Sequence, residues 1–139
     1  MQVEMWSLDR IKPYEKNPRI NDDAVAAVVQ SINEFGFRQP IVVDPDGVII
    51  VGHTRWKAAK QLNLAEVPVH IATDLEPEAV KAYRIADNRT GENAKWDYDL
   101  LPIEVGELQQ VGFDCELLGF NSDELAKLLD PGVTEGLCD

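Results

Sequence analysis

The chain has 139 residues, of which 45% are hydrophobic and 27% charged, and this composition is typical of one globular domain. Its net charge is −12, no apolar run is long enough to span a membrane, and the first ten residues lack the basic and apolar regions of a signal peptide. We therefore expect a cytoplasmic protein without a membrane partner. The two cysteines, Cys115 and Cys138, are widely spaced, which excludes a disulfide framework and a zinc site.

The negative charge is concentrated in the last third of the chain. Residues 97–139 contain eleven acidic side chains and one basic side chain, Lys127, whereas residues 1–96 are almost balanced. An acidic surface repels the phosphates of DNA, so we expect DNA contact only with the help of another domain or partner. The predicted helices after residue 97 offer no basic recognition face, and the sequence predicts no helix-turn-helix there.

The first elements are a strand and a helix. Residues 3–6 alternate in polarity and predict a short strand, and residues 17–19 (Asn-Pro-Arg) predict a loop. Asn21 is a favourable N-cap for a helix whose apolar residues, from Val25 to Phe35, share one face. Gly36 is expected to end that helix.

Two short apolar runs follow, and a glycine joins the second run to a helix. Residues 41–43 and 48–51 predict strands, and Asp-Pro-Asp-Gly at 44–47 predicts the turn of a hairpin between them. Gly52 interrupts the apolar run, and a helix is expected over residues 53–62.

The remaining elements are one strand and three helices. Residues 67–72 predict a strand, and Pro68 places it at a sheet edge or at the strand's beginning. Helices are expected from Pro77 to about Arg89, from Asp99 as N-cap to Gly112, and from Asp123 to Leu129. Asn121 and Glu124 match a capping box for the last of these helices.

These elements predict an α+β fold, with a small mixed sheet in the first half and helices in the second. We expect one domain over residues 1–112. Residues 113–139 are expected to form an acidic extension with one short helix and a frayed end from Pro131 onward.

The junction at Gly52 predicts an anion-binding site. A strand that feeds a helix through a glycine leaves backbone N–H groups at the helix N-terminus, where the helix dipole also favours negative charge. Thr54 adds a hydroxyl and Arg55 a planar set of donors, and His53 adds a ring N–H. We expect this turn to hold the phosphates of a nucleotide.

Three segments in order resemble the N-terminal domain of the ParB family, which shares its fold with sulfiredoxin. Residues 36–43 (GFRQPIVV) resemble the family's segment ending in QPIVV, and residues 52–59 (GHTRWKAA) resemble its GERRxRAA phosphate motif. Residues 85–89 (IADNR) resemble its ENxxR helix. The resemblance implies that residues 36–43 lie against a nucleotide's base and sugar. It also implies that Asp87 and Asn88 hold Mg²⁺ beside the phosphates.

The pairing of GHTR with ADNR is similar to a branch found on phage and bacterial chains, often ahead of a DNA methyltransferase. This chain departs from the partitioning motif, because His53 and Thr54 replace the glutamate and the first arginine of GERR. Gly91 stands where the arginine of ENxxR would be, and Arg89 is the expected substitute. His53 also replaces the cysteine nucleophile of sulfiredoxin's GCHR turn, which excludes sulfiredoxin chemistry.

Our hypothesis is a ParB-like, Mg²⁺-dependent domain that binds a nucleoside triphosphate, CTP or ATP, in phage or bacterial DNA transactions, with NTPase or nuclease activity as candidate chemistry. The expected metal ligands are Asp87 and Asn88, and the candidate catalytic groups are Glu92 and His53. The expected nucleotide-binding residues are Arg19, Gly36, Gln39, Pro40, Gly52, His53, Thr54, Arg55, Asn88 and Arg89.

Two alternatives stay open at the level of sequence. The first is a nucleotide-dependent kinase for a small molecule such as free serine, which some relatives of this fold phosphorylate. The second is a non-catalytic adaptor whose acidic C-terminal half docks a DNA methyltransferase or another partner. A homodimer is also compatible with the sequence.

Overall fold

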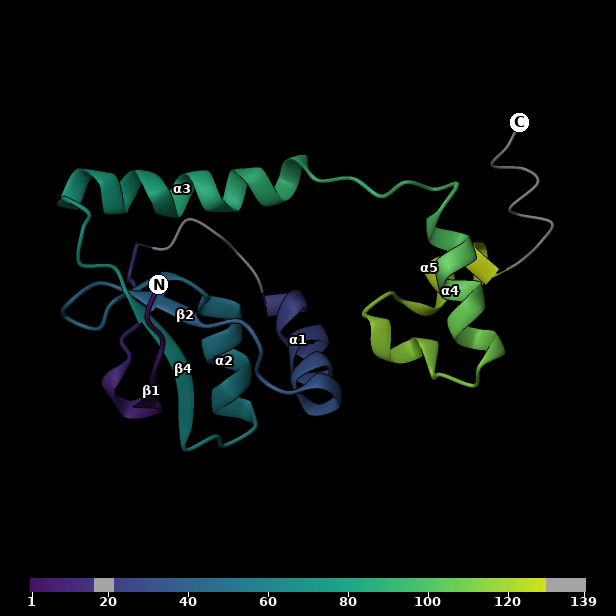
Figure 1. Cartoon of the computed structure of the whole chain (residues 1–139), viewed down its shortest axis with the longest axis horizontal. Helices are drawn as coiled ribbons and strands as arrows, with labels where there is room; N and C mark the ends of the chain where they lie inside the picture. The colour runs from purple at the N-terminus through teal and green to yellow at the C-terminus, as the bar shows by residue number, and fades with distance from the viewer. Residues whose placement is uncertain (17–21, 130–139) are drawn as a thin grey trace. The chain divides into compact units, whose positions relative to one another are not determined.

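The computed structural model describes residues 1–16 and 22–129, which form two compact units, Met1–Asn93 and Ala94–Asp139 (Figure 1). The boundary expected at residue 112 falls inside the second unit. The loop expected at 17–19, the N-cap Asn21, Cys138 and the frayed end lie outside the described residues. None of the described helices is long and apolar enough to cross a membrane.

The first unit contains a mixed sheet of four strands in the order β1-β4-β2-β3. The strands are β1 (Glu4–Ser7), β2 (Ile41–Val43), β3 (Ile49–Val51) and β4 (Glu66–Ile71). Strand β1 is antiparallel to β4, β2 is parallel to β4, and β2 and β3 form the predicted antiparallel hairpin.

The hairpin turn is organised by Asp44 and Gly47. The carboxylate of Asp44 accepts the N–H groups of Asp46 at 2.9 Å and Val48 at 3.0 Å. Gly47 has a φ of +87°, and a Cβ at this position would lie 2.7 Å from the carbonyl oxygen of Arg10. Glycine therefore lets the turn approach the 3₁₀ helix η1 (Leu8–Arg10) closely.

Pro68 lies inside the central strand β4, so the prediction of an edge or first position is wrong. The N–H of Ala72 donates to Val43 on the β2 side at 2.8 Å. Because N–H groups alternate along a strand, the nitrogen of Pro68 faces the same side, one residue before the pairing with β2 begins at Val69. The missing donor therefore falls beyond the end of the β2 ladder.

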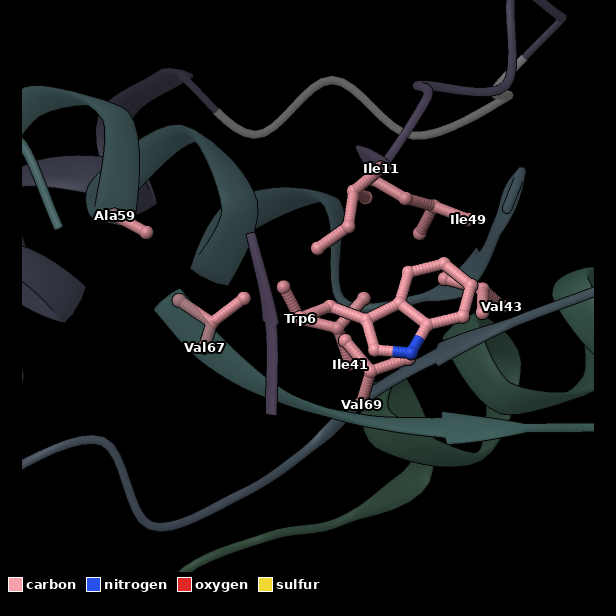
Figure 2. Packing of buried hydrophobic residues seen from close by; sticks show 8 residues of the cluster. All are labelled: Trp6, Ile11, Ile41, Val43, Ile49, Ala59, Val67 and Val69. Atoms are coloured by element: carbon pink, nitrogen blue, oxygen red, sulfur yellow. The ribbon is translucent and has the colours of Figure 1, made fainter. Parts of the chain in front are cut away.

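The two faces of the sheet are covered by different helices. Helices α1 (Asp22–Phe35) and α2 (His53–Gln61) pack together, and Ala59 of α2 joins the largest apolar cluster. Figure 2 shows this cluster, which consists of Trp6, Ile11, Ile41, Val43, Ile49, Ala59, Val67 and Val69. Helix α3 (Pro77–Asn93) contributes Val80 to a second cluster with Ile50 and Ala72. The side chains of neighbouring strand residues such as Ile49 and Ile50 therefore pack on opposite faces of the sheet.

The second unit has its own apolar core. It contains α4 (Leu101–Gln110), the 3₁₀ helix η2 (Cys115–Leu118) and α5 (Ser122–Leu129). The buried residues are Val105, Cys115, Leu125 and Leu128.

The capping of α5 follows the sequence prediction, whereas the capping of α4 differs from it. The N–H of Asn121 donates to Glu124 Oε1 at 2.9 Å, and the N–H of Glu124 donates to Asn121 Oδ1 at 2.8 Å, so the capping box is confirmed. Ahead of α4, the carboxylate of Asp97 accepts the N–H of Asp99 at 2.9 Å and that of Leu100 at 3.2 Å. Asp97, and not the predicted Asp99, is therefore the acceptor there.

Candidate functional site

A cavity of about 740 Å³ lies in the first unit, where the β2–β3 hairpin, the start of α2 and α3 meet. Its apolar wall includes Val42 and Ile50 of the hairpin and Ala72, which directly follows β4. Its polar wall includes eight predicted site residues from three separate segments: Gln39, Pro40, Gly52, His53, Thr54, Arg55, Asp87 and Asn88.

Gly52 shapes the start of α2. It is the N-cap, with φ +112° and ψ 24°, and a Cβ there would lie 3.3 Å from Cγ1 of Ile41. The first hydrogen bond of the helix runs from the N–H of Trp56 to the carbonyl oxygen of Gly52 at 2.9 Å. Gly52 has no side chain that could cap the helix. The first turn of α2 therefore presents its backbone N–H groups and the positive end of the helix dipole to the cavity.

His53 is buried and is held by a loop residue far away in the sequence. Its Nε2 accepts the backbone N–H of Tyr14 at 3.0 Å. Burial, followed by the positive charges of Arg84 and Lys57, lowers the pKa of His53 to about 4. The ring is therefore neutral at pH 7, with its proton on Nδ1. Because the Nε2 lone pair is occupied by Tyr14, the arrangement does not suit the predicted role of general base.

Arg55 is half-buried and lies between two polar side chains. Its Nη2 donates to Oε1 of Gln39, which joins two of the motifs recognised in the sequence. Burial lowers the pKa of the Arg55 guanidinium, and the nearby carboxylate of Asp87 raises it. An arginine keeps its charge at neutral pH, so the cavity has a fixed cation at the start of α2.

Helix α3 adds a residue that the sequence analysis missed. Arg84 lines the cavity, although only 7% of its surface is exposed. Its Nε donates to the carbonyl oxygen of Ile49 at 3.1 Å, and its Cζ lies 3.7 Å from the ring centroid of Tyr14. The available signal was the spacing of Val80, Arg84, Asp87 and Asn88, which places all four on one helix face.

Other predicted residues lie elsewhere. Arg89 and Glu92 are 68% and 65% exposed, pair with each other at 3.0 Å, and are outside the set of described residues that line the cavity. Gly36 lines a smaller neighbouring cavity of about 230 Å³, which shares Gln39 and Arg55 with the first. Arg19 falls outside the described residues.

Asp87 and Asn88 are suited to Mg²⁺. They are half-buried neighbours on α3, and both line the cavity with oxygen-bearing side chains. In the described part of the chain, no group of three or more histidine, cysteine, aspartate or glutamate residues could hold a metal ion alone. Mg²⁺ commonly binds one or two protein oxygens and completes its shell with phosphate and water, so this pair fits it.

Residues 1–88 match the family model of the ParB N-terminal domain. The chain belongs to the ParB N-terminal domain family. Residues 99–138 match a second model, the ParB-methyltransferase HTH domain. The expectation that no helix-turn-helix follows residue 97 is therefore wrong, because it relied on the charge of the helices and not on their packing. The match agrees with the predicted link to DNA methyltransferases.

Relatives with curated names match the chain over different lengths. The ParB-like nuclease domain-containing protein YnaK of Escherichia coli (strain K12) is 39% identical over 79 residues, which cover 56% of this chain and 91% of YnaK. The probable chromosome 1-partitioning protein ParB of Deinococcus radiodurans is 31% identical, over 94% of this chain but only 44% of the relative. A ParB of Rickettsia bellii is 39% identical over 50% of this chain and 25% of the relative. The matched regions thus span 44% and 25% of the length of these two partitioning proteins.

Solved structures show the same fold. C-terminally truncated ParB from Caulobacter crescentus, complexed with CTP-gamma-S, has a TM-score of 0.68 and 20% identity, over 99% of this chain and 89% of that one. Sulfiredoxin from Arabidopsis thaliana has a TM-score of 0.50 and 24% identity, over 60% of this chain and 97% of that one. The predicted α+β fold of the ParB/sulfiredoxin type is confirmed.

Proposed function

We propose that the cavity binds a nucleoside triphosphate, with its phosphates against the first turn of α2. The observation that carries this proposal is the convergence on one cavity of the uncapped start of α2, the Arg55 guanidinium, and the oxygen donors of α3. Backbone donors and a fixed cation are a favourable combination for phosphate. The CTP-gamma-S complex of Caulobacter ParB supports this assignment.

The proposed Mg²⁺ complex would be held by Asp87 and Asn88. When bound, the metal supplies positive charge to phosphate oxygens. The carboxylate of Asp87 acts on Arg55 electrostatically, so a divalent cation at Asp87 would also leave Arg55 less neutralised and better able to bind an anion.

Binding rather than turnover is the function that the described residues support best. Of the two candidate bases, Glu92 is exposed and paired with Arg89, and His53 has its lone pair engaged by Tyr14. A general base beside the phosphates would assist both hydrolysis and transfer to serine, and neither candidate is placed to act as one. Incubation with ATP and free serine, followed by a search for phosphoserine and for released phosphate, is expected to give neither product.

The binding proposal is tested by calorimetric titration of the full chain with CTP, ATP, GTP and ADP, with and without Mg²⁺. Arg55→Ala is expected to abolish binding, and Lys60→Ala, a cation that lies over Trp56 on the same helix, is expected to leave it unchanged. Asp87→Ala should remove the Mg²⁺ dependence, whereas exposed Glu78→Ala on α3 should keep it. If Arg55→Ala and Asp87→Ala both bound nucleotide like the parent, the site would be wrongly placed.

We also propose that DNA is reached through a partner, with a DNA methyltransferase as the leading candidate. The observation that favours it is the match of residues 99–138 to the ParB-methyltransferase HTH domain, in a segment with eleven acidic side chains and one basic side chain from residue 97 onward. Such a segment lacks the cations that displace counterions from DNA. The full chain alone should leave duplex DNA unretarded in a gel at about 0.15 M salt. Retardation at micromolar protein would contradict this proposal.

A further inference from the structure

The cavity contains a second cation, Arg84, which projects from α3, whereas Arg55 projects from the start of α2. Arg84 is held from two directions. Its Nε donates to the carbonyl oxygen of Ile49 in β3, and its guanidinium lies over the ring of Tyr14. A hydrogen bond and an aromatic stack together fix the plane of the guanidinium.

No carboxylate in the described part of the chain forms an ion pair with Arg84. Its protein contacts there are the Ile49 carbonyl and the Tyr14 ring, and neither carries a charge. The buried polar atoms without a partner among the described residues are the indole nitrogens of Trp6 and Trp56, so the two Nη atoms of Arg84 reach solvent. Because Arg84 lines the cavity, these donors are available to a ligand bound there.

A cation that is more than nine-tenths buried without a carboxylate carries a desolvation cost that a bound anion would offset. We propose that Arg84 is the second anion-binding side chain of this cavity, so that the ligand carries at least two linked anionic groups, one against Arg55 and the start of α2 and the other against Arg84. This inference rests on the proposed function and deepens it, since it selects nucleoside diphosphates and triphosphates over monophosphates.

The inference also accounts for a departure in the phosphate motif. Thr54 stands where the GERR motif has its first arginine, which leaves α2 with one cation fewer in its first turn. Arg84 supplies a cation to the same cavity from α3.

Calorimetric titration of the full chain with CTP and with inorganic triphosphate, a probe without base or sugar, tests the role of Arg84. Arg84→Met removes the charge and keeps most of the length, and its affinity for both ligands should fall at least about tenfold, because a charge-assisted contact is lost. Lys81→Met removes an exposed cation from the same helix and should bind both ligands like the parent. The affinities of the parent and of Arg84→Met for inorganic monophosphate should differ by less than about twofold, because a single phosphate binds to the start of α2 and to Arg55.

Circular dichroism and thermal melting show whether Arg84→Met is folded. If Arg84→Met is not folded, NMR spectroscopy of the parent protein decides the question. The measured signal is the ¹H–¹⁵N resonance of Arg84 Nε, which is assigned because it is missing from the spectrum of Arg84→Lys. Addition of inorganic triphosphate should shift this resonance.

The outcomes separate the two proposals. If the parent and Arg84→Met bind CTP equally, or the Nε resonance stays unmoved at saturation, the role of Arg84 is refuted while nucleotide binding stands. If the parent binds inorganic triphosphate through Arg84 but no nucleotide, the nucleotide proposal fails and the anion site stands. If the parent binds neither CTP nor inorganic triphosphate, both the nucleotide-binding proposal and the role of Arg84 are refuted.

Discussion

The neutral, buried His53 makes the stability of the first unit depend on pH. Its pKa is lowered to about 4 from 6.5 by burial and by the charges of Arg84 and Lys57. Between these two values the unfolded chain binds a proton that the folded chain does not, so stability falls as the pH decreases from 6.5 to 4. The slope is about 1.4 kcal/mol per pH unit, and integration gives a loss of about 2 kcal/mol between pH 7 and pH 5. Above pH 6.5, His53 makes little further contribution to the change of stability with pH.

The chain has two histidines, so one substitution isolates the signal. In ¹⁵N-labelled His70→Gln protein, the remaining imidazole belongs to His53, and its ring shifts should report a proton on Nδ1 and a titration near pH 4. Urea unfolding should show that His53→Gln, whose side-chain oxygen can still accept the Tyr14 N–H, loses about 2 kcal/mol less stability than His70→Gln between pH 7 and pH 5. A titration near pH 6.5, or equal losses in the two variants, would refute this reasoning.

Three substitutions test the local structure by urea and thermal unfolding of the full chain. Gly47→Ala should destabilise by about 3 kcal/mol, because the new Cβ meets the Arg10 carbonyl oxygen at 2.7 Å from a backbone with φ +87°; a change below about 1 kcal/mol would show that the turn relaxes freely. Gly91→Ala, in α3 with open space around the new Cβ, should instead stabilise by about 0.5–1 kcal/mol, and a loss of stability would contradict this. Asn121→Ala should destabilise the second unit by about 1 kcal/mol through loss of the cap on α5, and an unchanged midpoint would argue against a stabilising capping box.

The sequence predicted the elements whose signals are local. The amphipathic face of α1, the turn at 44–47 and the reciprocal bonds of Asn121 and Glu124 depend on residues within a few positions of each other, and all three are present. The glycine that interrupts the apolar run also predicted the junction between a strand and a helix, and Gly52 has a positive φ there, which glycine adopts at little cost.

Features that depend on contacts between distant segments were missed. Pro68 was placed at an edge by a rule about lost donors, but its place in the sheet depends on where β2 begins to pair with β4. The roles of His53 and Arg84 both involve Tyr14, which is 39 residues from one and further from the other, and no periodicity connects them. Arg89 and Glu92 were assigned by motif and spacing, yet they lie on an exposed part of α3 and pair with each other.

Tyr14 joins the two helices that carry the proposed anion site. Its backbone N–H reaches His53 at the first position of α2, while its ring supports Arg84 on α3. Because Arg84 also disfavours the imidazolium form of His53, an anion that neutralised Arg84 would raise the pKa of His53. By thermodynamic reciprocity, protonation of His53 would tighten the hold on that anion. The added proton occupies Nε2, so protonation also breaks the hydrogen bond from the Tyr14 N–H. The electrostatic effect of Arg84 on His53 thus links proton uptake to anion uptake, and the imidazole becomes a reporter of occupancy at a site that it does not itself need to contact.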